Sequence, residues 1–137
     1  MNVASRLLSD LLPAVQTKAE EAVNLCRKRG IEPLIYCTYR SAEEQNELFA
    51  QGRTTPGRIV TNARGGLSWH QWRRAIDVVP LLHGKPLWVY RPTDPHWTGM
   101  VEVFKLCGWE WAGDWKGFRE FVHFQITDGF KLEDMPK

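Results

Sequence analysis

The sequence has few cysteines, and none of them are arranged to build a site. Its 137 residues include only three, Cys26, Cys37 and Cys107, and no two form a Cys-x-x-Cys pair. An odd, widely spaced set does not make a disulfide framework, and without paired spacing a zinc site built from thiolates is not expected. All three lie in apolar patterns, as buried free thiols do. We therefore expect the chain to be made in a reducing compartment.

Long apolar runs and a strong charge of one sign are also missing. No stretch approaches the roughly 18 consecutive apolar residues of a membrane span. Residues 1–12 show no basic segment followed by a long apolar run, so we expect no secretory signal. The net charge is only +2, and the Lys and Arg residues are scattered rather than gathered in a stripe. We therefore expect a monomer made in the cytoplasm, with no membrane or nucleic-acid partner.

Tryptophan, in contrast, is abundant, with seven residues in the chain. Large aromatic side chains are core material, and they also line ligand clefts. The length and the 43% hydrophobic content are typical of one soluble domain with a proper core. We interpret residues 1–137 as a single domain, with residues 1–8 and 131–137 as loose ends.

Apolar periodicity predicts three helices and several short strands. Each predicted helix has a capping residue at its start and a glycine at its end: Asp10 to Gly30, Ser41 to Gly52, and Asp94 to Gly108. Strands are predicted at residues 31–38, 75–80, 87–90 and 121–126, with 87–90 returning from a hairpin turn at residues 83–85. Residues 53–67 read as a long loop, which is usually functional or mobile. This mixed order predicts an α+β fold with a small antiparallel sheet flanked by helices.

The stretch Ser68–Asp77 offers His70 and Asp77, seven residues apart. Imidazole and carboxylate groups are both zinc ligands, at about 2.0–2.2 Å. The segment ends as a strand, so a bend after His70 must set the relative direction of the two side chains. By itself the pair is weak evidence for a metal site, and a core histidine with a surface or turn aspartate is the favoured alternative.

A second stretch near the C-terminus places His123 in an apolar strand, three residues after Glu120. A buried imidazole must find partners or bind a metal. Positions three apart face opposite sides of a strand, so both can reach one metal only if Glu120 lies in a turn or bulge before the strand. Two His and one Asp leave a zinc position open, and a nearby Glu can act as a base.

Arg40 lies at the junction between the first strand and the second helix. A fixed guanidinium there can bind a substrate carboxylate or stabilise developing oxyanion charge. The alternative is an ordinary surface ion pair with Glu43 or Glu44. The other two histidines are poor candidates, because His83 lies in a predicted hairpin turn and His96 in the exposed first turn of a helix.

These motifs resemble those of the M15 zinc peptidases. The resemblance extends from about residue 30 to residue 126, and its three motifs occur in the family's order: Tyr39-Arg40-Ser41-x-x-Glu44-Gln45-x-x-Leu48-Phe49-x-x-Gly52-Arg53-Thr54, Ser68-x-His70-x-x-Arg73-x-Ala75-x-Asp77, and Gly108-Trp109 with Glu120-x-x-His123-Phe124. The compact length and the run from Gln51 to Gly57 look most like the endolysin branch. The resemblance implies a single hedgehog/DD-peptidase-like domain.

The resemblance also implies a role for each site residue. One zinc ion would be held by the ligands His70, Asp77 and His123. Glu120 would be the general base, and Arg40 would stabilise the substrate carbonyl or oxyanion. Ser68 corresponds to a substrate-contacting serine, and Gln45 matches a recurring position that we also assign to substrate binding.

The implied activity is hydrolysis of amide bonds in bacterial peptidoglycan stem peptides. The endolysin branch implies an L-alanyl-D-glutamate endopeptidase that reaches the cell wall after holin-type release. A D-alanyl-D-alanine carboxypeptidase and a catalytically inactive wall-binding module on the same fold are the alternatives. One position departs from the family: Arg73 stands where the family has glycine, which suggests a tight bend there. Arg73 must therefore adopt a permitted conformation or alter the rim of the cleft.

Overall fold

The structure, a computed structural model, describes residues 4–135 and consists of three helices and one small antiparallel sheet. The helices are α1 (Pro13–Lys28), α2 (Ala42–Ala50) and α3 (Pro95–Leu106). The strands are β1 (Glu32–Cys37), β2 (Ala75–Leu82), β3 (Lys85–Pro86), β4 (Glu110–Trp111) and β5 (His123–Gln125). Within this described part of the chain, no helix has the length and apolar character needed to span a membrane. The predicted α+β class is confirmed.

The sheet has the strand order β1-β2-β5-β4, and β3 pairs only with the far end of β2. In the central strand β2, Asp77 is paired with Cys37 of β1 on one side and with His123 of β5 on the other. The three residues therefore form a row across the sheet. Side chains alternate along a strand, so Asp77 faces away from its neighbours Ile76 and Val78.

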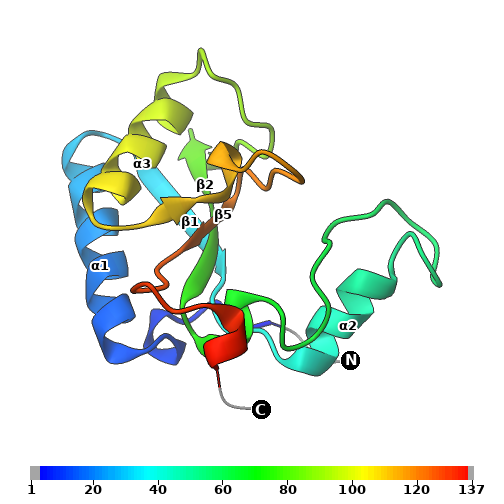
Figure 1. Cartoon of the computed structure of the whole chain (residues 1–137). Coiled ribbons are helices and arrows are strands. Elements are labelled where there is room, and N and C mark those ends of the chain that lie inside the picture. The colour runs from blue at the N-terminus through cyan, green and yellow to red at the C-terminus, as the bar shows by residue number, and fades with distance from the viewer. Residues whose placement is uncertain (1–3, 136–137) are drawn as a thin grey trace.

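The core lies where α1 and α3 pack together against the sheet (Figure 1). Its fully buried side chains come from all three elements, and they include Val15, Ala19, Trp97, Phe104, Ile76 and Phe124. Pro13 occupies the first turn of α1, where a missing N–H costs nothing. Helix α1 begins there rather than at Asp10, whose carboxylate instead accepts a hydrogen bond from Ser5.

Helix α2 lies apart from this core and, with the loop at residues 51–67, forms an arm that projects from the body (Figure 1). The predicted capping box is present: the Ser41 hydroxyl accepts from Glu44 N at 3.1 Å, and the Glu44 carboxylate accepts from Ser41 N at 3.0 Å. Along α2 only Gln45 is buried. Packing against the core therefore contributes little to holding this helix.

The predicted return strand at residues 87–90 is wrong, because the hairpin ladder with β2 ends at Pro86. Beyond it, Leu87 N donates to Pro80 O at 2.9 Å, but residues 87–90 form no strand. On that side of β2, Val78 N already donates to Val122 O, at 2.9 Å. The space beside β2 is thus occupied by the chain leading into β5. The C-terminal strand is also shorter than predicted, at His123–Gln125.

The chain ends carry structure where they are described. Ser5 N donates to Tyr39 O at 2.9 Å, and Thr38 N donates to Ser5 O at 2.7 Å. Residues 132–134 form a short 3-10 helix. Residues 1–3 and 136–137 of the expected loose ends lie outside the described part.

Candidate active site

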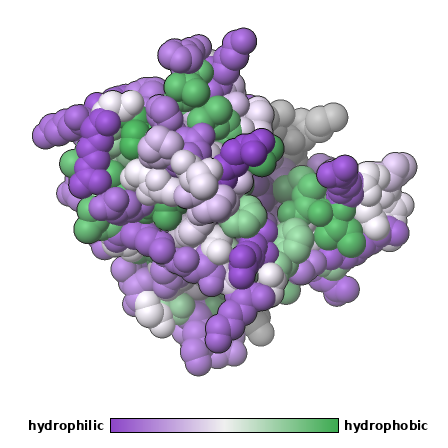
Figure 2. Space-filling model, turned by 90° about the horizontal axis from the view of Figure 1, so that it is seen from above, coloured by the Kyte–Doolittle hydropathy of each residue, from purple (hydrophilic) through white to green (hydrophobic). Residues whose placement is uncertain are grey.

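A cleft of about 690 Å³ lies between the body and the arm. The space-filling view shows the hollow between the main mass and the projecting part (Figure 2). Most of the side chains singled out in the sequence line this cleft: Arg40, Ser68, His70, Asp77, Glu120 and His123. Residues from four separate regions of the chain thus meet around one hollow.

His70 is placed by a four-residue 3-10 helix, Trp69–Trp72, that leads into β2. Ser68 caps this helix by accepting from His70 N at 3.3 Å. His70 Nδ1 lies 2.8 Å from Thr38 O, and its Nε2 lies 3.1 Å from Asp77 Oδ1. A carbonyl oxygen only accepts, so the ring proton is on Nδ1 and the Nε2 lone pair faces Asp77.

His123 reaches the same carboxylate from the neighbouring strand. Its Nδ1 lies 3.4 Å from Asp77 Oδ1, and its Nε2 lies 2.8 Å from Gln125 Oε1. Glu120 lies just before the strand, in a turn closed by His123 N donating to Glu120 O at 3.2 Å. This is the turn that the sequence required if Glu120 and His123 were to face one site, and both side chains line the cleft.

The donor set fits a zinc ion. Two imidazole nitrogens face the same oxygen of Asp77, with the two rings 5.0 Å apart between centroids. Each ring has its other nitrogen held by an oxygen, as outer partners hold metal-binding histidines. Such a concentration of lone pairs calls for a cation or a proton between them. Two His and one Asp are also a typical ligand set for a catalytic zinc.

Cys37, His70 and Asp77 form a competing group, whose donor atoms all lie within 4.8 Å of one another. The Arg40 guanidinium occupies that side, with Nη2 3.3 Å from Cys37 Sγ and 3.1 Å from Asp77 Oδ2. Burial raises the pKa of the Cys37 thiol to about 12, whereas a metal needs the thiolate. The cationic neighbour and the protonated thiol both disfavour this group, so we favour His123 as the third ligand.

The electrostatics of the site follow from burial and from the shared carboxylate. Burial would raise the pKa of Asp77, but the charges and hydrogen bonds of the two histidines outweigh it and hold the pKa well below its usual value. Desolvation lowers the pKa of His70. Desolvation also opposes the charged form of His123, but its hydrogen bond to Asp77 prevails and the pKa is raised. Burial raises the pKa of Glu120, as suits a proton-accepting group.

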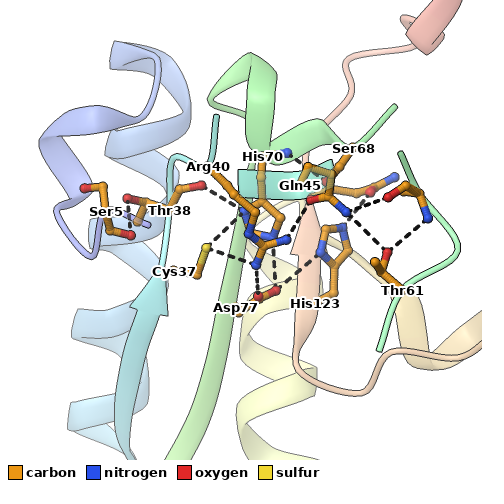
Figure 3. A network of polar contacts seen from close by, with 12 residues as sticks. Ser5, Cys37, Thr38, Arg40, Gln45, Thr61, Ser68, His70, Asp77 and His123 are labelled. Atoms are coloured by element: carbon orange, nitrogen blue, oxygen red, sulfur yellow. Dashed lines mark hydrogen bonds and ion pairs between the residues drawn. The ribbon is translucent and has the colours of Figure 1, made fainter. Parts of the chain in front are cut away.

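Arg40 pairs with Asp77 and not with Glu43 or Glu44. Its Nη1 donates to Gln45 Oε1 at 2.9 Å, and its Nη2 contacts Asp77 and Cys37 (Figure 3). Glu44 is engaged in the capping box instead. The corner between β1 and α2 therefore directs this guanidinium into the cleft.

Ser68 and Gln45, both expected to contact substrate, have different positions. Ser68 lines the cleft while its hydroxyl caps the 3-10 helix. Gln45 is 1% exposed and is not among the described residues that line the cleft. Its amide accepts from Arg40 and donates to Thr61 Oγ1 at 3.3 Å and to Ala63 O at 2.8 Å. Gln45 thus ties Arg40 to the loop behind the cleft wall.

Arg73 adopts the left-handed conformation, with φ 60° and ψ 35°, as the C-cap of the 3-10 helix. This is the tight bend that the family's glycine suggests. Its guanidinium points away from the cleft: Nη1 donates to Asp10 O at 2.8 Å, and the group lies 4.1 Å above the Tyr39 ring. Arg73 therefore braces the N-terminal segment and does not shape the rim of the cleft.

Gln125 is a site residue that the sequence reasoning missed. It lines the cleft, and its side chain holds the outer nitrogen of His123. The signal was present in the sequence, since Gln125 lies two positions after His123 and shares its face of the strand. Thr38 was missed for another reason: its backbone carbonyl, not its side chain, holds His70.

Comparison with known proteins identifies relatives for both the sequence and the fold. A peptidase M15 family described as D-alanyl-D-alanine carboxypeptidase matches residues 61–126. The chain is 38% identical, over 124 residues, to the peptidoglycan L-alanyl-D-glutamate endopeptidase CwlK of Bacillus subtilis (strain 168), covering 86% of this chain and 74% of that protein. It is 29% identical to the L-alanyl-D-glutamate peptidase of Listeria phage A118 over 88% of this chain, and spans 39% of that longer protein.

Solved structures with the same fold include two peptidases. The Serratia marcescens L-Ala D-Glu endopeptidase ChiX superposes with a TM-score of 0.65 at 21% identity, covering 88% of this chain and 83% of that one. VanYB in complex with D-alanine-D-alanine superposes with a TM-score of 0.64 at 16% identity, covering 97% and 87%. The fold that carries the cleft is therefore shared well beyond recognisable sequence similarity.

Proposed function

The chain belongs to the M15 family of peptidases, and on that premise we propose that it is a zinc-dependent peptidoglycan hydrolase that cleaves the L-alanyl-D-glutamate bond of stem peptides. The observation that carries the proposal is the convergence of two histidines, an aspartate, a glutamate and an arginine on one cleft. The 38% identity to an L-alanyl-D-glutamate endopeptidase supports the choice of bond.

The metal would be held by His70 Nε2, His123 Nδ1 and the Asp77 carboxylate. When bound, zinc supplies Lewis acidity, which polarises a carbonyl and lowers the pKa of water to about 7 in other enzymes. The chain itself fixes the orientation of these three ligand groups. Thr38 O and Gln125 Oε1 fix the two rings, and Arg40 fixes the second oxygen of Asp77.

Glu120 moves the proton in the proposed reaction. Its carboxylate accepts no hydrogen bond from the described residues, and its raised pKa makes it a stronger base than an exposed glutamate. It takes a proton from the water whose oxygen attacks the amide carbonyl carbon. When the C–N bond breaks, Glu120 returns that proton to the leaving nitrogen.

Arg40 supplies positive charge beside the carbonyl oxygen. Its contacts with Gln45, Cys37 and Asp77 use three of the five N–H donors of a guanidinium. The remaining donors and the charge are available to stabilise the oxyanion that forms during attack. Ser68 can offer its hydroxyl proton to a substrate carbonyl, because its oxygen already accepts from His70 N.

The charges of the cleft favour an endopeptidase over a carboxypeptidase. A carboxypeptidase needs a cation for the terminal carboxylate of its substrate. Among the described residues that line the cleft, Arg40 is the only Lys or Arg, and its free donors are assigned above to the carbonyl oxygen of the cleaved bond. The cleft walls are otherwise formed in part by apolar side chains such as Leu48, Trp115 and Phe118. We therefore place the cut inside the stem peptide.

We also propose that the protein acts as a monomeric, endolysin-type enzyme that reaches the wall after holin-type release. The similarity to a phage peptidase supports this proposal. Expression in a bacterial host should lyse the cells only when a separate pore is supplied. Lysis without such a pore would contradict this route.

Digestion of purified muropeptides tests the activity and the bond together. The wild-type protein with zinc should yield fragments cut between L-alanine and D-glutamate, as read by mass spectrometry. Glu120→Gln should lower the rate by about 10²- to 10⁴-fold, the usual contribution of a general base. Glu102→Gln, on the exposed face of α3, is the matched control and should leave the rate unchanged.

The other products have defined meanings. Loss of a single alanine would show a D-alanyl-D-alanine carboxypeptidase. Binding of wall material without release of new amino groups would show an inactive module. Full activity of Glu120→Gln would overturn the assignment of the base.

A further inference from the structure

The two histidines of the site are oriented by different means. His70 Nδ1 faces the backbone carbonyl of Thr38, which can only accept a hydrogen bond. His123 Nε2 faces the side-chain amide of Gln125, at 2.8 Å from its Oε1. An amide can present either its oxygen or its NH₂ group to a partner. The orientation of the Gln125 amide therefore determines whether His123 Nε2–H finds an acceptor, which leaves Nδ1 to the metal.

A carboxylate on the neighbouring strand sets that orientation. Gln125 Nε2 donates to Glu110 Oε2 at 3.1 Å, and Thr127 Oγ1 donates to Glu110 Oε1 at 3.3 Å. An ionised carboxylate only accepts, so the NH₂ group of Gln125 must face Glu110 and its oxygen must face His123. The sheet register supports this alignment, because Glu110 and Gln125 are directly paired between β4 and β5.

We propose that Gln125 and Glu110 are positioning residues for the metal site, through which Glu110 holds the Gln125 oxygen toward His123 Nε2–H and so leaves Nδ1 to the metal. This inference rests on the proposed zinc site. Gln125 is 8% exposed, so water does not readily replace its hydrogen bond to His123. Glu110 is exposed at the edge strand and acts only through Gln125.

Zinc affinity, measured by competition with a chelator, is the first test. Gln125→Met keeps the side-chain length but removes the acceptor, and it should weaken zinc binding by about 10- to 100-fold. The double variant Gln125→Glu/Glu110→Gln exchanges the two groups, so that an amide faces the new carboxylate; it retains an acceptor for His123 Nε2 and should bind zinc within a few-fold of the wild-type protein. Glu110→Gln, at an exposed position where folding is not at risk, should cause a smaller loss than Gln125→Met. The matched control Gln16→Met, on α1, should have no effect.

Solvent exchange of the His123 Nε2–H proton is the second test, and it does not depend on zinc. In the zinc-free protein with the ring protonated, NMR should show this proton exchanging slowly, because it donates to the buried oxygen of Gln125. Gln125→Met should speed the exchange, whereas Gln16→Met should not.

The outcomes separate this inference from the proposed function. Unchanged zinc affinity in Gln125→Met, or a loss in the double variant Gln125→Glu/Glu110→Gln as large as in Gln125→Met, would overturn the positioning role. A wild-type protein that binds no zinc would overturn the proposed function instead. In that case the exchange rate of the His123 Nε2–H proton would still decide whether Gln125 and Glu110 orient the ring.

Discussion

The body and the arm form the two walls of the cleft, and they are built differently. The body wall carries His70, Asp77 and His123 on or beside sheet strands whose opposite face packs on a core of fully buried side chains. The arm wall consists of α2 and a long loop that exposes Ile59, Val60 and Leu67. A rigid sheet suits chemistry, which needs fixed geometry, whereas a loosely packed arm suits the admission of a polymeric substrate.

Gln45, on α2, is a polar link between the two walls. It joins Arg40, at the edge of the body, to Thr61 and Ala63 in the loop of the arm. This comparison predicts that changes in the body abolish metal binding and turnover. Changes in the arm should alter substrate binding and stability and leave the metal in place.

Asp77→Asn should have the largest effect, because it removes the charge that both histidines and Arg40 share. We expect a loss of zinc affinity greater than the roughly 100-fold upper limit for an outer partner, together with loss of measurable hydrolysis. Zinc content after dialysis and muropeptide digestion would measure both. Asp94→Asn is the matched control, since asparagine caps a helix as well as aspartate does. Normal zinc content in Asp77→Asn would contradict its assignment as a ligand.

Gln45→Met should have a smaller effect, and it should change stability and substrate binding instead of zinc binding. Removing the amide leaves the part-buried Ala63 carbonyl and one Arg40 donor without their partner, at a cost of up to about 1–3 kcal/mol in stability. We expect KM for the stem peptide to rise, and hydrogen exchange at residues 61–63 to accelerate. Zinc affinity should match that of Gln16→Met. A loss of zinc affinity as large as in Gln125→Met would show that the arm and the body are not independent.

Features of the site that follow from local sequence could be predicted, and those that depend on neighbouring strands could not. The capping box at Ser41 and the turn before His123 are set by residues close in sequence. The return strand at residues 87–90 failed because Val122, distant in sequence, already occupies that side of β2. Gln45 was expected to contact substrate, but its amide is buried behind the residues that line the cleft. Sequence pattern does not say which buried amide faces a cavity.

Arg73→Gly should have the smallest effect on zinc binding and cleavage. It serves as a control because Arg73 lies in the body but outside the cleft. A non-glycine residue in the left-handed region costs about 1–2 kcal/mol, which glycine would relieve. The same change removes the hydrogen bond to Asp10 O and the contact with the Tyr39 ring, worth about 1 kcal/mol each at most. We therefore expect the thermal midpoint to shift by only a few degrees in either direction. Zinc affinity and the cleavage products should be unchanged, because the guanidinium points away from the cleft. A change in the bond that is cut would show that Arg73 acts on substrate after all.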